Sequence, residues 1–204
     1  MVRAVVRFIA AVMSVSGALL IADAATTLLW QEPVSAFVAE GNQDELEQAL
    51  TNPPERVVER RPLPGDAIGR IDIPSIGVSE YVVEGTSTDD LRQGPGHYPS
   101  TPLPGGRGTA AIAGHRTTYG APFRRIDELE AGQRVVVDTP ARRYVYRVEK
   151  TEIVDDSDLS VLDPVGHRRL LLSACHPLYS AEQRIIAYAR QVATQPARVS
   201  STAD

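Results

Sequence analysis

The sequence predicts a mostly β domain that closes into a barrel of about eight strands with short helices, behind an N-terminal membrane helix. Three observations support this fold class. The N-terminal thirty residues are largely apolar. Short runs that favour strands alternate with turn signals between residues 65 and 193. Within that region only two short helical pieces stand out, Ser87–Leu91 and Pro122–Leu129, which disfavours a doubly wound α/β sheet.

The N-terminal segment is long enough to cross a membrane. Two arginines precede the uncharged stretch Phe8–Ala22, and its extension to Trp30 gives a helix of about 35 Å, against a hydrocarbon core of about 30 Å. Asp23 opposes insertion, but it lies towards the outer end, where its cost is smaller. Residues 1–30 are therefore predicted to be a single-pass anchor with a cytoplasmic N-terminus and the remaining chain outside the cytoplasm. A cleaved signal peptide, suggested by Ala22-Asp23-Ala24, and a core helix are the alternatives.

Residues 31–64 differ in composition from what precedes and follows them. Seven acidic residues against three arginines give this segment a charge of −4, and it contains several prolines. A helix is possible over Ala36–Leu50, and Pro53-Pro54 would end it. We interpret the segment as a stalk between the membrane and a domain formed by residues 65–193. The polar residues 194–204 are expected to be a disordered tail.

The strands of this domain are expected from alternation and from β-prone residues. Ile71 and Ile73 alternate with polar residues, Tyr144–Val148 is β-prone throughout, and Leu170–Leu172 is continuously apolar, as in a central strand. The candidate strands are Ala67–Ile73, Gly77–Val83, Thr109–Gly114, Arg134–Thr139, Tyr144–Val154, Arg169–Ala174 and Ile185–Ala193. A long loop rich in glycine and proline, Gly94–Gly108, interrupts them.

Composition excludes several classes of function. The formal net charge of −5 and an aromatic content of 5% argue against a nucleic-acid partner. The single cysteine, Cys175, excludes an intrachain disulfide and a zinc site of four cysteines. The acidic residues Asp155, Asp156 and Asp158 lack the glycine and glutamate of an EF-hand, so no metal site is expected there.

Three strands bring chemically reactive side chains towards one groove. Cys175 ends an apolar strand and is followed by His176-Pro177 and a polar loop, where a thiol can meet solvent. Arg184 begins the next strand nine residues later, and an antiparallel return places this arginine beside the cysteine. His115 ends another apolar strand. The sequence therefore predicts that a thiol, an imidazole and a guanidinium face the same groove.

The motifs around these residues resemble those of the sortase transpeptidases. The resemblance rests on Ala113-Gly114-His115, on Ser173-Ala174-Cys175-His176-Pro177 and on Arg184, and it extends over residues 65–193. The finer patterns Gly94-Pro95-Gly96-His97-Tyr98 and Gly114–Phe123 are similar to class E, the housekeeping sortases of high-G+C Gram-positive bacteria. One position departs from the family, because Ala174 stands where a threonine usually precedes the nucleophile.

The resemblance implies a sortase-type β-barrel and a cysteine transpeptidase without a cofactor. It implies that Cys175 is the nucleophile, that His115 is the acid and base, and that Arg184 holds the signal peptide or stabilises the oxyanion. The implied substrate is the C-terminal sorting signal of exported proteins, LAXTG- or LPXTG-like, cleaved after threonine through a thioacyl-enzyme and transferred to a cell-wall amine of the peptidoglycan precursor. The candidates for contact with the signal are Tyr119, Thr117, Thr118 and Ala174.

Two other functions stay open on the sequence alone. One is a pilus-assembling sortase of another class. The other is a degenerate sortase that binds sorting signals without cleaving them, for which Ala174 is the hint. A lone cysteine that closes an apolar strand is usually a small buried hydrophobe, and its spacing to His115 and Arg184 argues against that interpretation here. His97 and His176 are expected to have structural roles in their loops.

Overall fold

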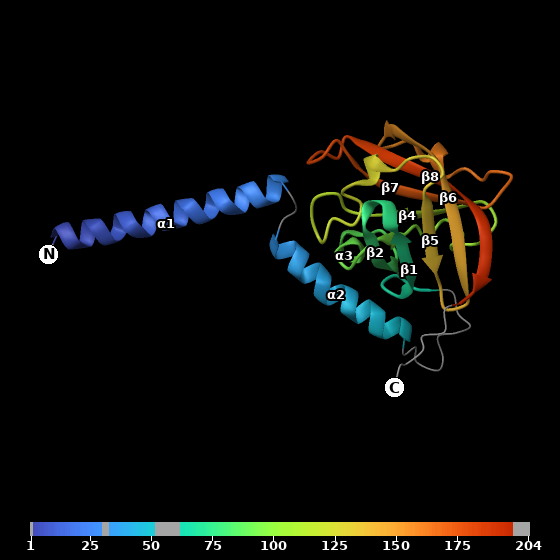
Figure 1. Ribbon diagram of the computed structural model, residues 1–204, viewed down its shortest axis with the longest axis horizontal. Coiled ribbons are helices and arrows are strands. Elements are labelled where there is room, and N and C mark those ends of the chain that lie inside the picture. The colour runs from blue at the N-terminus through green and yellow to red at the C-terminus, as the bar shows by residue number, and fades with distance from the viewer. Residues whose placement is uncertain (1, 30–32, 52–61, 198–204) are drawn as a thin grey trace.

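Two helices precede the barrel in the chain. The computed structural model describes residues 2–29, 33–51 and 62–197. Helix α1 (Val2–Leu29) projects away from the barrel, whereas α2 (Pro33–Thr51) lies along its side (Figure 1). Within α1, Val2–Thr26 is long and apolar enough to cross a membrane, with a mean hydropathy of 2.2. This helix falls within the predicted anchor, and its length and composition suit that role.

The predicted mostly β fold is confirmed, and the barrel is closed. In the described part of the chain the strands pair in the order β1-β2-β3-β4-β7-β8-β6-β5. The pairs β2–β3 and β4–β7 are parallel, and the other neighbours are antiparallel. The strands are β1 (Ala67–Ile73), β2 (Val78–Glu84), β3 (Gly96–His97), β4 (Thr109–Ala113), β5 (Arg134–Asp138), β6 (Arg142–Asp155), β7 (Arg169–His176) and β8 (Gln183–Pro196).

The alternation of side chains along β7 separates the barrel interior from an outer face. Leu170, Leu172 and Ala174 belong to the main core, which is filled largely by Ile, Val and Leu side chains of the strands. The intervening Leu171 belongs to a second cluster outside the barrel, with Ala111, Ile186 and Tyr188. The 3₁₀ helix η3 (Leu159–Leu162) packs over that second cluster through Leu162 and Val161. Cys175 follows Leu171 at even spacing, so its side chain leaves β7 on the outer face.

The short helices match the helical pieces predicted from the sequence less closely than the long strands match the predicted strands. Helix α3 (Thr88–Leu91) begins with the capping box of Ser87 and Asp90, within the expected helical piece. Only Ile126–Glu128 of the second expected piece is helical, as the 3₁₀ turn η2. One reason is that the carbonyl of Arg124 accepts hydrogen bonds from the Arg116 side chain, so it is not free to bond within a longer helix.

Helix α2 changes the interpretation of residues 33–51. The helix expected over Ala36–Leu50 forms, but it packs against the barrel and does not hold the domain away from α1. Ala39 and Leu46 are buried in this contact. Residues 31–32 and 52–61 of the expected stalk lie outside the described residues. Thr194–Pro196, which were expected to be part of a disordered tail, instead pair with the start of β6, and residues 198–204 of that tail lie outside the described residues.

Local hydrogen bonds and one glycine account for two further turns, the 3₁₀ turn after β1 and the acidic turn after β6. The turn η1 (Pro74–Ile76) links β1 to β2 and ends at Gly77, which has a φ of 73°. In the acidic turn before η3, the Asp155 carboxylate accepts hydrogen bonds from Ser157, and the Asp158 carboxylate accepts them from Ser160. Within the residues that the structure describes, no group of three or more His, Cys, Asp or Glu side chains is arranged to hold a metal ion.

Candidate active site

Strand pairing brings the ends of β4, β7 and β8 together. Cys175 on β7 is the direct partner of Arg184 on β8, so both side chains leave the sheet on the same face. β4 runs parallel to β7 with Ala113 opposite Ser173, and the Gly114 N–H donates to the Ser173 carbonyl at 3.0 Å. Continuing this register by two residues places His115 level with Cys175. The three strand ends that carry these residues therefore lie side by side in the fold, and the meeting of their side chains in one groove stays a prediction.

Cys175 has a free, half-buried thiol at the edge of a small cavity. The cavity has a volume of about 350 Å³ and lies between the loop after β4 and the loop between β7 and β8. Its lining residues are Arg116, Thr117, Cys175, Tyr179, Ser180 and Ala181. A thiol with this exposure can be reached by a substrate, unlike the inert buried cysteines of protein cores.

His115 lies in a partly desolvated position against an aromatic ring. Its ring centroid is 5.3 Å from that of Tyr119, with the two planes tilted by 44°. Burial lowers the pKa of His115 below its ordinary value, because a low-dielectric environment disfavours the imidazolium. Its Nε2 atom is buried and has no hydrogen-bond partner among the described residues. No described protein group therefore competes for a hydrogen bond with this nitrogen.

Arg184 is held by the loop that precedes it. Its Nη1 donates to the Ala181 carbonyl at 2.7 Å and to the Gln183 carbonyl at 2.9 Å. The side chain also lines a small hollow on the outer face, next to Ser173 and η3. These bonds occupy one end of the guanidinium fork and fix its orientation beside the thiol. The guanidinium carries five N–H donors in a fixed geometry, so other donors are left for a ligand.

The candidates for substrate contact fall into two groups. Thr117 lines the cavity at Cys175, and Tyr119 packs on His115. Thr118 shapes the loop between them, because its carbonyl accepts a hydrogen bond from the Ala121 N–H at 2.9 Å. Ala174 does not line the groove. It is only 3% exposed and belongs to the barrel core, because neighbouring residues of a strand point to opposite faces.

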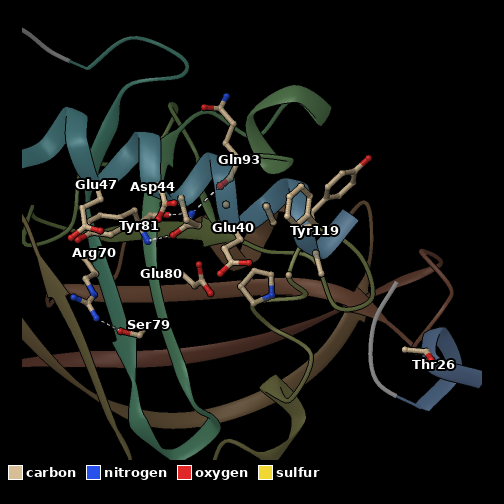
Figure 2. A pocket seen from close by; sticks show the side chains of 17 residues that line it. Thr26, Glu40, Asp44, Glu47, Arg70, Ser79, Glu80, Tyr81, Gln93 and Tyr119 are labelled. Atoms are coloured by element: carbon tan, nitrogen blue, oxygen red, sulfur yellow. Dashed lines mark hydrogen bonds between the residues drawn. The ribbon is translucent and has the colours of Figure 1, made fainter. Parts of the chain in front are cut away.

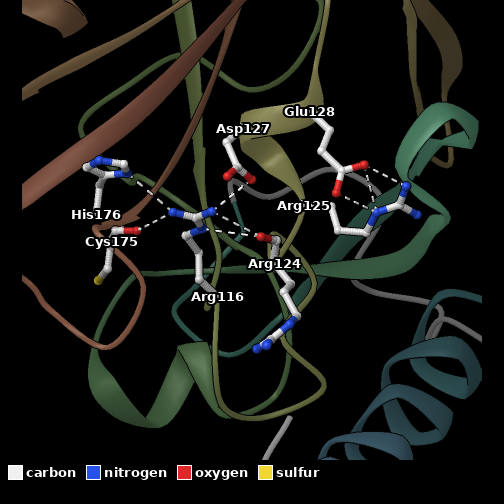
Figure 3. Close-up of polar contacts among 7 residues, drawn as sticks. All are labelled: Arg116, Arg124, Arg125, Asp127, Glu128, Cys175 and His176. Atoms are coloured by element: carbon white, nitrogen blue, oxygen red, sulfur yellow. Dashed lines mark hydrogen bonds and ion pairs between the residues drawn. The ribbon is translucent and has the colours of Figure 1, made fainter. Parts of the chain in front are cut away.

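Arg116 is a buried cation that sequence reasoning did not single out. Its side chain is 2% exposed and forms an ion pair with Asp127, with 2.8 Å between Nη2 and Oδ1 (Figure 3). Its nitrogens also donate to the Arg124 carbonyl at 3.1 and 3.3 Å and to the Cys175 carbonyl at 3.4 Å. Nη1 lies 3.4 Å from Nδ1 of His176. Arg116 thus ties the loop after β4 to the residue that carries the thiol.

Replacing Arg116 by methionine is expected to destabilise the barrel and to disturb the site. The carbonyls of Arg124 and Cys175 would lose the charged donor that they share in partly buried hydrogen bonds, and each such bond is worth about 1.5–3 kcal/mol of unfolding free energy. Urea unfolding of the full chain in detergent micelles, followed by circular dichroism, measures this loss.

Arg125→Met is the matched control for that experiment. Arg125 lies at the start of η2, and its side chain forms an exposed ion pair with Glu128 (Figure 3), so its loss should leave the unfolding midpoint unchanged. Equal midpoints for Arg116→Met and Arg125→Met would contradict the assigned role of Arg116.

His97 and His176, for which structural roles are expected, have polar partners in other segments of the chain. His97 is buried, and its Nδ1 lies 2.7 Å from Oε2 of Glu84, while Nε2 lies 3.0 Å from the Pro102 carbonyl. His176 accepts from Arg116 at the edge of the cavity. Both contacts suit the structural roles expected from the sequence.

Known proteins resemble this chain in sequence and in structure. The sortase domain family matches residues 71–192. Sortase D of Bacillus subtilis (strain 168) is 36% identical over 137 residues, which cover 65% of this chain and 67% of that protein. Sortase SrtE1 of Streptomyces coelicolor (strain ATCC BAA-471 / A3(2) / M145) is 32% identical over 149 residues, which cover 65% of this chain but only 42% of that protein.

Two solved structures show the same likeness. A sortase D5 transpeptidase of Clostridium perfringens superposes with a TM-score of 0.66 at 26% identity, covering 76% of this chain and 99% of that chain. The crystal structure of sortase E1 from Streptomyces coelicolor, with a tripeptide in the active site, superposes with a TM-score of 0.62 at 32% identity, covering 67% of this chain and 94% of that chain.

Proposed function

The chain belongs to the sortase family, and on this premise we propose that it cleaves the C-terminal sorting signals of exported proteins and transfers them to a cell-wall amine. The observation that carries the proposal is the strand register at the site. Cys175 pairs with Arg184 across β7 and β8, and the parallel register of β4 brings His115 to their level. A nucleophile, a proton donor and a fixed cation then serve the same reacting carbonyl.

The reaction proceeds in two acyl-transfer steps. The Cys175 thiolate attacks the carbonyl carbon of the signal's threonine, and Arg184 donates to the oxyanion or to the signal backbone. His115, as imidazolium, gives its proton to the departing amine as the peptide C–N bond breaks, which leaves a thioacyl-enzyme. The amine of the peptidoglycan precursor then attacks the thioester, neutral His115 takes the amine's proton, and the thiolate leaves.

The protonation states required by this scheme are scarce at neutral pH. For model cysteine and histidine side chains at pH 7, about 3% of the thiol is ionised and roughly a quarter of the imidazole is charged. Independent titration puts both forms together in about 1% of molecules. Burial lowers the pKa of His115, which reduces the imidazolium population further at pH 7. We therefore propose a slow enzyme that works from a minor population.

We assign the enzyme to class E and expect an LAXTG-like signal to be preferred. The class E pattern in residues 114–123 supports this assignment, and Tyr119 of that segment packs directly on His115. Ala174 was the reason to consider a degenerate sortase that binds signals without cleaving them. Its side chain lies in the core, so its replacement of the usual threonine takes no hydroxyl group out of the groove, and we do not propose such a binder. Helix α1 is proposed to anchor the protein with its N-terminus in the cytoplasm and the barrel outside.

A peptide-cleavage assay with the full chain in detergent micelles tests the function. Peptides containing LAXTG and LPXTG are incubated with the protein and hydroxylamine, and products are identified by mass spectrometry. Cleavage between threonine and glycine, with hydroxamate formation, is the expected result. A scrambled peptide is the control. Absence of both cleavage and a Cys175 adduct would refute the proposal, and preference for LPXTG would refute the class E assignment alone.

A further inference from the structure

Helix α2 makes specific contacts with the barrel that the proposed chemistry does not use. Ser35, Ala39 and Leu46 are buried on the side that faces the barrel, whereas Val34 and Phe37 are exposed. A cavity of about 750 Å³ remains between α2, the β1–β2 hairpin and the loop after β4. Figure 2 shows this cavity with Tyr81 towards one end and Tyr119 towards the other. The helix therefore reaches from the hairpin to the loop that covers His115.

The side chain of Gln43 fixes where α2 lies. Its Oε1 accepts from the Tyr81 N–H at 2.6 Å, and its Nε2 donates to the Tyr81 carbonyl at 3.1 Å and to the Gln93 carbonyl at 2.8 Å. The amide thus pairs with the backbone of β2 much as a neighbouring strand would. A Cβ atom on Gly94 would lie 2.2 Å from this Nε2, so the residue at 94 must lack a side chain for the contact to form.

The N-terminal turn of α2 holds the loop at the active site. The Tyr119 N–H donates to Oγ of Ser35 at 2.8 Å. Tyr119 has a φ of 50°, a left-handed conformation that a bulky residue adopts only when its surroundings impose it. Asn42 of the same helix donates to the Arg92 carbonyl at 3.0 Å, and the Arg92 guanidinium lies 5.8 Å from the Tyr119 ring centroid. Both contacts keep the Tyr119 ring where it packs on His115.

We propose that α2 is part of the catalytic unit, in which Ser35 and Gln43 are positioning residues that hold the Tyr119 loop against His115. Gln43 docks the helix on β2, and Ser35 then fixes the backbone of Tyr119. The inference rests on the proposed function only in that it takes His115 as the residue that exchanges protons. A fragment that begins at residue 65 would lack these contacts and would lose part of its activity.

The Ser35 hydrogen bond is tested with two variants of equal size. Ser35→Thr and Ser35→Val add the same bulk, but only threonine keeps the oxygen that accepts from Tyr119. Assayed as the full chain in micelles, Ser35→Val is expected to lower kcat/KM for the signal peptide by about two- to tenfold, the effect of one hydrogen bond. Ser35→Thr is expected to retain most of the activity.

The docking contact is tested with a charge-matched pair. Gln43→Glu replaces the donor nitrogen by an oxygen that would face two carbonyls, which should release α2 from β2. Gln48→Glu makes the same change at an exposed position of the same helix. Only Gln43→Glu is expected to lower kcat/KM.

The position of the Tyr119 ring is read directly from the His115 nuclear magnetic resonance signal. Histidine is labelled at Cε1, and the His115 signal is assigned as the one that disappears in His115→Gln. Tyr119→Leu gives the chemical shift of the His115 signal in the absence of the Tyr119 ring. Ser35→Val and Gln43→Glu should move the signal towards the Tyr119→Leu position, while Ser35→Thr and Gln48→Glu should not. The inference would be overturned if Ser35→Val matched Ser35→Thr, and Gln43→Glu matched Gln48→Glu, both in kcat/KM and in the His115 signal. Failure of the wild-type chain to cleave the peptide would refute the function, and the His115 signal would still decide the role of α2.

Discussion

Replacing Cys175 by serine is expected to reduce peptide cleavage by at least about 10³-fold, as the loss of a catalytic nucleophile does in other acyl-transfer enzymes. A thiolate is accessible near neutral pH, whereas a serine hydroxyl stays protonated and needs a strong base to activate it. His115 cannot supply that activation, because the scheme requires its imidazolium form for the leaving amine. The thiol is half-buried beside a cavity, so the smaller oxygen should fit without disturbing the barrel.

The measurement is hydroxamate release from the signal peptide, with the unfolding midpoint recorded for each variant. Ser180→Ala is the matched control, since Ser180 lines the same cavity as Cys175 but has no proposed role in bond formation. It should retain near wild-type cleavage. Cleavage by Cys175→Ser within tenfold of the wild-type rate would show that another group attacks the threonine carbonyl.

Sequence patterns predicted the long strands and the meeting of the three strand ends for identifiable reasons. Strand register follows from alternation of apolar residues. The nine-residue spacing between Cys175 and Arg184 therefore sufficed to predict that they pair across two antiparallel strands. The two-residue strand β3 was not predicted, because Gly96 and His97 carry no periodic signal. The closure of the barrel through β3 depends on backbone pairing with β2 and β4.

Local sequence patterns could not predict the side-chain contacts between residues far apart in the chain. Arg116 and Asp127 are eleven positions apart, and nothing in their neighbourhood marks this arginine as buried among the other arginines of the chain. The docking of α2 depends on Gln43 meeting the backbone of Tyr81, a contact between residues 38 positions apart. An acidic, proline-containing segment favours a stalk by composition, and a few specific hydrogen bonds determine that its helix docks instead.

A buried pair of titratable groups, Glu84 and His97, joins two of the strands that close the barrel. The side chains are 3% and 1% exposed, on β2 and β3 respectively. Nε2 of His97 must carry a hydrogen, because the Pro102 carbonyl beside it can only accept. A single proton then lies in the 2.7 Å contact between Nδ1 and Oε2, so the pair has no net charge wherever that proton resides.

Removing either partner of this pair is expected to cost about 3–5 kcal/mol of unfolding free energy, since the other group would remain buried without its partner. Glu84→Ala and His97→Ala should both show this loss in urea unfolding of the full chain in micelles. The double variant Glu84→Met with His97→Leu should be more stable than either single variant, because it leaves no unpaired polar group at this place. Glu128→Ala, which breaks the exposed pair with Arg125, is the control and should change stability little. A double variant that loses the sum of the single losses would show that Glu84 and His97 act independently, and that the short strand β3 is held by its backbone bonds alone.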